Sequence, residues 1–157
     1  MDLHGLRSEV ADLYADYVAC LDEGELERWP EFFVDDCRYQ IVPRENYERR
    51  LPLALMSCES KGMLRDRVAA VRQTSVYGPR MMRHLVSSVR VRESTRDSVA
   101  VEANFALFET PLDEPTRVFN AGRYFDQLVR IDGQLKFKEK LCVLDGAVIR
   151  GSLIYPI

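Results

Sequence analysis

Hydrophobic residues recur along the chain with two different periods. In residues 6–21 and again in residues 63–73, an apolar side chain returns every three or four positions, which is the spacing of an amphipathic helix. From His84 onward the period changes to two, which is typical of strands that bury one face. The stripe of the first predicted helix consists of Leu6, Val10, Leu13, Tyr14, Tyr17, Val18 and Leu21.

Four long strands are predicted in the second half of the chain. The alternating pattern covers residues 85–91, 99–107, 117–131 and 134–144. Asp132-Gly133 separates the last two and is a strong signal for a two-residue hairpin turn. This half of the sequence therefore predicts an antiparallel meander.

Weaker signals fill the stretch between the two predicted helices. Residues 25–33 predict a second short helix that carries Trp29, and residues 37–43 predict a short strand. Residues 44–62 contain Pro52 and show no clear period, so we expect them to be irregular.

Helices followed by sequential strands predict an α+β fold rather than alternating βαβ units. One face of the meander is too apolar to be left in water, and about three N-terminal helices can cover it. The expected product is a curved antiparallel sheet wrapped around helices, a cone that can hold a pocket. A chain of 157 residues is long enough for one sizeable core and too short for two, so we expect a single domain over residues 1–157.

Composition and charge exclude several classes of protein. The formal net charge of −3 argues against nucleic acid as the main partner. No apolar run approaches the length of about 18 residues that a membrane span needs. The chain starts with MDLHGLRSEV, which lacks an apolar signal core, and this favours a cytoplasmic protein.

Histidine and cysteine are too scarce and too scattered for the common metal sites. His4 and His84 are the two histidines, and the four cysteines show no CxxC spacing. A Rieske cluster needs two cysteines and two histidines in close pairs, and a mononuclear oxygenase iron usually needs two histidines and a carboxylate. We therefore expect no metal and no cofactor on this chain.

The predicted turn also fixes the register of the last hairpin. With the residues that flank the turn paired, Asp126 lies opposite Glu139 on a face that is otherwise apolar. Two adjacent carboxylates either share a proton, as in general acid/base catalysis, or recruit an arginine. Because arginine is abundant in this chain, we expect a structural network of Arg123, Asp126 and Glu139.

The order and spacing of several motifs resemble the small (β) subunit of aromatic-ring-hydroxylating dioxygenases, over essentially the whole chain. Two positions, Met81 and Ser88, depart from the residues that many members carry there. The matching motifs are Leu21-Asp22, Trp29, Phe33, Asp36-Cys37, Tyr39, Met63 to Val68, Tyr77, Arg83-His84, Gly122 to Asp126, Ile131 to Phe137, and Pro156.

The resemblance implies a cone of the nuclear-transport-factor-2-like (NTF2-like) type and a larger partner. That partner is an α subunit carrying a Rieske [2Fe-2S] cluster and a mononuclear Fe(II), commonly in an α3β3 hexamer that also brings β chains together. A reductase dependent on NAD(P)H completes such systems. The β subunit itself is expected to hold no catalytic, cofactor-binding or metal-binding residue and to support assembly.

The segment from Cys58 to Leu64 resembles the branch of the family that acts on aromatic carboxylates. Terephthalate is the expected substrate of the complete enzyme within that branch, with benzoate-type, salicylate-type and anthranilate-type acids as neighbours. The residues give no physical reason to prefer one acid, because the resemblance places the substrate pocket in the other subunit.

Residues 77–84 collect aromatic and cationic side chains just before the first long strand. Cations so close together are hard to neutralise when one chain buries them alone. At a subunit contact they can meet carboxylates or carbonyl groups of the neighbour, and large interfaces are rich in such anchors. We therefore predict Tyr77, Arg80, Arg83 and His84 as subunit-interface residues.

A stand-alone enzyme or a ligand-binding module on the same cone remains the alternative. Asp35-Asp36 resembles a ketosteroid-isomerase pattern, but the position of the general base falls on Ile41, which cannot take a proton. A dehydratase of the scytalone type would need a histidine–aspartate pair in the cone, for which His84 with Asp126 is the candidate.

Overall fold

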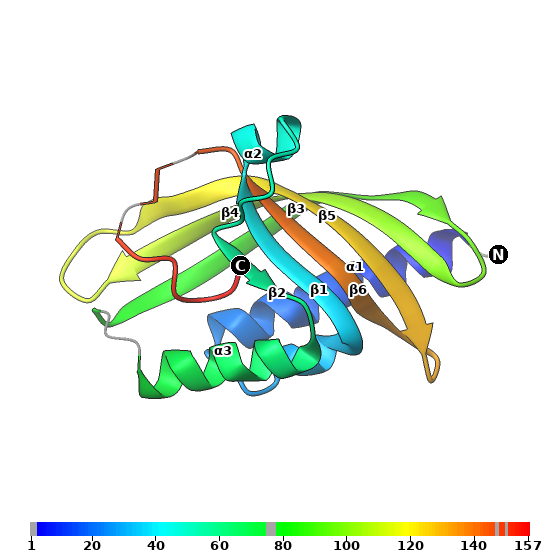
Figure 1. Ribbon diagram of the computed structural model, residues 1–157, viewed down its shortest axis with the longest axis horizontal. Helices are drawn as coiled ribbons and strands as arrows, with labels where there is room; N and C mark the ends of the chain where they lie inside the picture. The colour runs from blue at the N-terminus through cyan, green and yellow to red at the C-terminus, as the bar shows by residue number, and fades with distance from the viewer. Residues whose placement is uncertain (1–2, 75–77, 147, 150) are drawn as a thin grey trace.

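The computed structural model describes residues 3–74, 78–146, 148–149 and 151–157, and within these ranges six strands form one curved sheet (Figure 1). The strand order is β2-β1-β6-β5-β4-β3. The strands are β1 (Phe33–Pro43), β2 (Met56–Cys58), β3 (Arg80–Ser94), β4 (Ser98–Pro111), β5 (Arg117–Ile131) and β6 (Gln134–Leu144).

Helices lie on both faces of this sheet, and the longer ones are those that the periodicity predicts. The helices α1 (Leu3–Asp22) and α3 (Lys61–Gln73) lie on one face, and α2 (Arg44–Glu48) lies on the other (Figure 1). A 3-10 turn, η1 (Trp29–Phe32), leads into β1. Ser60 caps α3, because its side chain accepts a hydrogen bond from the backbone N–H of Met63. None of the helices in the described ranges has the length and apolar content of a membrane span.

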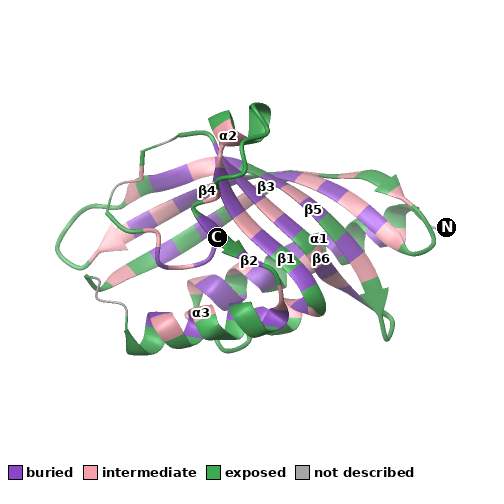
Figure 2. Cartoon of the chain, in the orientation of Figure 1, coloured by how far each residue is buried: buried purple, intermediate pink, exposed green. Residues whose placement is uncertain are grey.

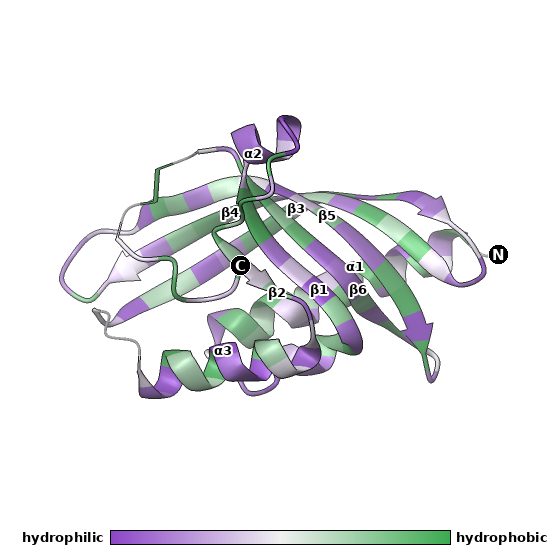
Figure 3. Cartoon of the chain, viewed as in Figure 1, coloured by the Kyte–Doolittle hydropathy of each residue, from purple (hydrophilic) through white to green (hydrophobic). Residues whose placement is uncertain are grey.

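The core lies between the sheet and the helices α1 and α3. Along the strands, buried positions alternate with exposed or half-buried ones (Figure 2), and hydropathy alternates with them (Figure 3). The inward side chains meet the stripe of α1 that the sequence predicts. The largest fully buried side chains include Trp29, Tyr14, Tyr17, Tyr39, Tyr124, Phe33 and Phe137. The α+β fold with a cone-shaped, curved sheet is therefore confirmed.

The N-terminal half differs from the prediction in three places. The helix expected over residues 25–33 is reduced to η1, because Phe33 is already a fully buried strand residue of β1. The stretch 44–62, expected to be irregular, contains α2 and the short strand β2. The sheet is mixed rather than antiparallel, since β1 runs parallel to β6.

The last hairpin keeps the predicted turn but not the predicted register. Asp132 and Gly133 both have positive φ, as a type I′ turn requires. The expected pairing of Leu128 with Phe137 is present, but a β-bulge follows it. Beyond the bulge, Asp126 pairs with Lys140.

The prediction that Asp126 faces Glu139 is therefore wrong. Glu139 pairs with Gln127 instead, and its side chain is exposed to solvent. The extra residue of the bulge moves every later position of β6 by one, so an acid that simple alternation directs inward turns outward.

Gly122 offers a direct test of how closely β5 and β6 approach. A Cβ atom at this position would lie 2.0 Å from the carbonyl oxygen of Val143, a backbone atom that cannot move aside. We expect Gly122→Ala to lower the free energy of unfolding by about 3 kcal/mol, as overpacking of a rigid site does. Urea denaturation followed by circular dichroism measures this. Gly146→Ala is the control, because nothing lies within 4 Å of its added Cβ; equal stability of both variants would contradict the close approach.

Candidate functional site

The interior of the cone contains a buried ion pair. The Nζ atom of Lys140 lies 2.9 Å from Oδ2 of Asp126, and both side chains are fully shielded from solvent. The hydroxyl of Tyr14, on α1, donates a hydrogen bond to the same carboxylate oxygen. The other oxygen accepts from the backbone N–H of Leu141 at 3.3 Å. The carboxylate of Asp126, on β5, is thus satisfied from two other elements, α1 and β6.

Aromatic rings enclose the ammonium group of Lys140. Its Nζ lies 3.5 Å from the ring centroid of Tyr124, 4.6 Å from that of Phe137 and 4.7 Å from that of Tyr17. The negative faces of such rings attract a cation, most strongly where water is excluded. The cage replaces part of the hydration that Lys140 loses on burial.

Burial dominates the protonation chemistry of this cluster. It raises the pKa of the Asp126 carboxyl, and the charge of Lys140 and the hydrogen bonds that Asp126 accepts offset this only in part. Burial also raises the pKa of the Tyr14 hydroxyl well above its usual value and that of the Cys142 thiol to about 12. The tyrosine and the cysteine therefore stay protonated at neutral pH.

The segment 151–157 packs against the cone and buries Ile154, Pro156 and Ile157. Ile157 is fully buried, and its carbonyl oxygen accepts hydrogen bonds from the hydroxyls of Tyr17 at 2.9 Å and Tyr39 at 3.3 Å. Arg67 of α3 donates to the carbonyl groups of Leu153 and Ile154. The side chains of Ile154 and Ile157 are thus part of the core of the cone.

His84 does not meet Asp126, so the pair considered for a dehydratase is not formed. Its Nδ1 atom lies 2.6 Å from Oδ1 of Asp22, the last residue of α1, and the backbone N–H of His84 donates to the same carboxylate. Both side chains are buried. The Nε2 atom of His84 is buried without a hydrogen-bond partner among the described residues.

Arg80 and His84 both contact carboxylates of their own chain, so neither residue needs a neighbouring subunit as its partner. Arg80 points inward, where NH1 lies 3.3 Å from the buried carboxylate of Glu109 and NH2 donates to the carbonyl of Ser152. Arg117 binds the other oxygen of Glu109. Tyr77 lies outside the described residues.

Arg83 and Arg123 both lie on the outer face of the sheet. The side chain of Arg83 is 69% exposed, and its nearest carboxylate, that of Asp22, is 3.8 Å away. Arg123 binds Glu102 at 3.0 Å and stacks on Phe125. Arg123 therefore does not compensate Asp126, and the expected arginine network is replaced by Lys140.

Comparison with known proteins identifies the family. The family model described as the ring hydroxylating β subunit matches residues 17–151. The chain belongs to this family of β subunits. It is 34% identical over 149 residues to the anthranilate 1,2-dioxygenase small subunit of Burkholderia cepacia, with 95% of this chain and 92% of the relative covered.

Two further relatives agree with this assignment. A terephthalate 1,2-dioxygenase β subunit of Comamonas is 27% identical, with 95% of this chain and 97% of the relative covered. A crystal structure assigned as the β subunit of an aromatic-ring-hydroxylating dioxygenase from Novosphingobium aromaticivorans has a TM-score of 0.90 and 39% identity, and covers 98% of both chains. The β subunit is thus a component of an oxidoreductase complex.

Two arrangements that catalysis would need are missing from the described residues of this β subunit. Across the described residues, no three histidine, cysteine, aspartate or glutamate side chains converge as a metal site would need. Ile41 is fully buried where an isomerase would place its base. Sequence reasoning missed the inward residues Lys140, Glu109 and Ile157, because alternation and motif spacing do not report long-range partners.

Breaking the buried pair gives a prediction with a defined pH dependence. Lys140→Met should lower the free energy of unfolding by about 3 to 5 kcal/mol near neutral pH, because Asp126 is left as an unpaired buried charge. A carboxyl whose pKa is higher folded than unfolded binds more protons in the folded state, so its stability contribution is lost as pH rises through the folded pKa. The deficit should therefore be smaller at about pH 5 than at about pH 8.

Urea denaturation at both pH values measures this deficit. Lys138→Met is the matched control, since Lys138 forms an exposed pair with Asp36 and its loss should cost no more than about 1 kcal/mol. Adding Asp126→Leu to Lys140→Met should restore much of the stability. A deficit that does not change with pH would show that Asp126 does not take up the proton.

Proposed function

We propose that this β subunit is a non-catalytic assembly subunit of a dioxygenase that hydroxylates aromatic carboxylates. The observation that carries the proposal is the interior of the cone, in which Ile157 and the caged Lys140–Asp126 pair are buried. A domain packed in this way can present a rigid outer surface to a partner. The alternative, a stand-alone enzyme, lacks support, because its candidate base His84 is buried and contacts Asp22 instead of Asp126.

The partner is proposed to be a larger α subunit that carries the Rieske cluster and the mononuclear iron. Membership of the β-subunit family supports such a partner. An α3β3 arrangement and a reductase that uses NAD(P)H follow from the same resemblance. The chemistry of ring hydroxylation would then take place entirely on the partner, with this chain fixing its geometry.

The proposed substrate class is an aromatic carboxylate. The relatives named above act on anthranilate and on terephthalate, both of which carry a carboxylate on an aromatic ring. A third relative, 31% identical, is the small component of the p-cumate 2,3-dioxygenase of Pseudomonas putida, and p-cumate is also an aromatic carboxylate. Terephthalate stays the specific substrate that the sequence predicts. Anthranilate is the second candidate substrate, because the identity to the anthranilate relative is higher.

Part of the outer sheet face is proposed as the contact with the α subunit. Met81, Arg83 and Leu85 point outward from β3, with Met81 68% and Leu85 52% exposed. The register places Arg83 beside Phe108 and then Val118, which is also exposed. An arginine surrounded by apolar side chains is a common anchor of protein interfaces.

Co-expression with the iron-containing large subunit tests the proposed function. We expect the two chains to co-purify, iron to be bound only when the large subunit is present, and turnover of anthranilate or terephthalate to exceed that of naphthalene at least about tenfold. Iron analysis and oxygen uptake provide the readouts. Stoichiometric iron on the isolated β chain, or full activity of the large subunit without it, would contradict the proposal.

Two arginines that are close in sequence separate the surface role from the structural one. Arg83→Ala should leave the free energy of unfolding within about 0.5 kcal/mol of wild type. It should still weaken retention of the large subunit about tenfold in a pull-down titration. Arg80→Ala should instead lower the stability by about 1 to 3 kcal/mol, because buried Glu109 and the Ser152 carbonyl lose a donor. Unchanged retention in Arg83→Ala would remove this contact.

A further inference from the structure

The carboxylate of Asp22 contacts two neighbouring residues of β3 that face opposite sides of the sheet. Successive side chains of a strand alternate, so His84 points into the cone and Arg83 points outward, with 2% and 69% of their side chains exposed. The side chain of Asp22 is only 5% exposed. Asp22 therefore lies at the rim of β3, the last strand in the order of the sheet, where it reaches residues of both faces.

Hydrogen bonds from His84 fix the position of this carboxylate. The Nδ1 atom lies 2.6 Å from Oδ1 of Asp22, and the backbone N–H of His84 donates to the two oxygens at 3.1 and 3.0 Å. A carboxylate only accepts hydrogen bonds, so Nδ1 carries a proton. A second proton, on the buried Nε2, would find no acceptor among the described residues. The ring with one proton adds no charge, so the negative charge of Asp22 is left for a cation.

Arg83 is the cation that this charge reaches. Its NH1 atom lies 3.8 Å from Oδ2 of Asp22, and no other carboxylate lies within 4 Å of it in the part of the chain that the structure describes. An ion pair with such an exposed partner contributes little to folding stability. A long side chain that is already held in one position nevertheless loses less conformational entropy when it binds a partner. The charge of Asp22 is therefore suited to orient Arg83 rather than to stabilise the fold.

We propose that Asp22 is a positioning residue, which holds the guanidinium group of Arg83 in the position from which it binds the large subunit. The inference rests on the assembly role and on the Arg83 contact proposed above. Asp22 is the last residue of α1 and is bound by His84 from inside the cone, so the helix and the sheet together set where Arg83 lies. An arginine of the outer face is in this way connected to the core of the β subunit.

Nuclear magnetic resonance relaxation of the isolated β chain tests the orientation of Arg83 without a partner. In Asp22→Asn, the order parameter of the Arg83 Nε–H bond should fall to below about 0.6, the range of flexible groups. Adding about 1 M NaCl to the wild type should lower the same order parameter, because salt screens a partly exposed pair. The salt measurement needs no substitution, so it does not depend on the stability of a variant.

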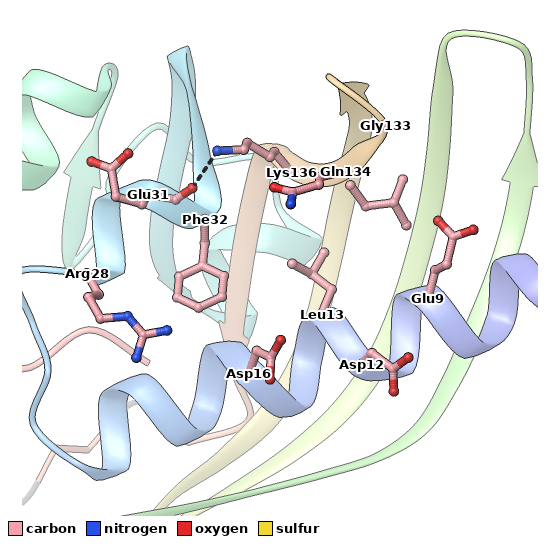
Figure 4. Close-up of a pocket in the computed structure, with 11 residues that line it drawn as sticks. Glu9, Asp12, Leu13, Asp16, Arg28, Glu31, Phe32, Gly133, Gln134 and Lys136 are labelled. Atoms are coloured by element: carbon pink, nitrogen blue, oxygen red, sulfur yellow. Dashed lines mark hydrogen bonds between the residues drawn. The ribbon is translucent and has the colours of Figure 1, made fainter.

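Glu9→Gln is the matched control for this measurement. Glu9 also lies on α1, at the groove between α1, η1 and the β5–β6 turn (Figure 4), and it pairs with Arg130 of β5 at 2.6 Å. Its substitution should lower the order parameter of Arg130 and leave that of Arg83 unchanged. An order parameter of Arg83 that changes neither in Asp22→Asn nor at high salt would overturn the positioning role.

A double-mutant cycle with the large subunit tests whether this orientation matters for assembly. Asp22→Asn alone should weaken retention of the large subunit about threefold to tenfold. In a chain that already carries Arg83→Ala, the same substitution should change retention less than about twofold, because the side chain that Asp22 positions is gone. A purely structural role of Asp22 predicts the same loss of retention in both backgrounds, and that result would refute the proposal.

Thermal unfolding and co-purification separate this inference from the proposed function. Asp22→Asn should lower the Tm equally with and without Arg83→Ala, because the lost hydrogen bonds to His84 do not involve Arg83. A large subunit that co-purifies with the wild type, but whose retention responds to neither substitution, would overturn the positioning role and leave the assembly role standing. A large subunit that does not co-purify with the wild type would contradict both.

Discussion

The buried pair of Lys140 and Asp126 is the constraint on which the rest of the structure depends. Two charges can be kept out of water only if every lone pair and every N–H of the pair finds a partner. Tyr14 supplies one partner from α1, Leu141 supplies another from β6, and aromatic rings cover the ammonium group. The pair therefore fixes where α1 lies on the sheet and how β5 and β6 align, and the cone closes around it.

Much of this fold follows from local signals in the sequence. The two long helices, the four sequential strands and the type I′ turn at Asp132-Gly133 can all be predicted from periodicity and turn chemistry. The bulge cannot be predicted in this way. The odd-numbered positions of β6 are nearly all apolar, so regular alternation predicts that they face inward along the whole strand. Alternation directs Lys140 to solvent, whereas the structure turns it inward, where Asp126 and the ring of Tyr124 hold its ammonium group. The outward apolar residues of β6 are Leu141 and Val143.

Long-range partners explain the other differences between prediction and structure. The inward course of Arg80 depends on Glu109, which is 29 residues away, and on the carbonyl of Ser152. The filling of the cone depends on Ile157 meeting tyrosines of α1 and β1. No local pattern reports such contacts. Family motifs instead identified the chain as a β subunit, because they reflect the whole arrangement at once. The interface over residues 77–84 stays a prediction, and Arg80, one of its arginines, turns inward.

The His84–Asp22 contact has a consequence for the free edge of the sheet. Strand β3 has a neighbour on one side only, and a long bare edge is a template on which other strands can add and start aggregation. The backbone N–H of His84 points away from β4, and the Asp22 carboxylate takes it up. Further along, Ser88 has a positive φ at an irregularity in the pairing with β4, which bends the edge. Strand β3 is thereby capped at His84 and bent at Ser88. A free β chain therefore exposes less straight, unpaired edge to which a strand of another molecule could add.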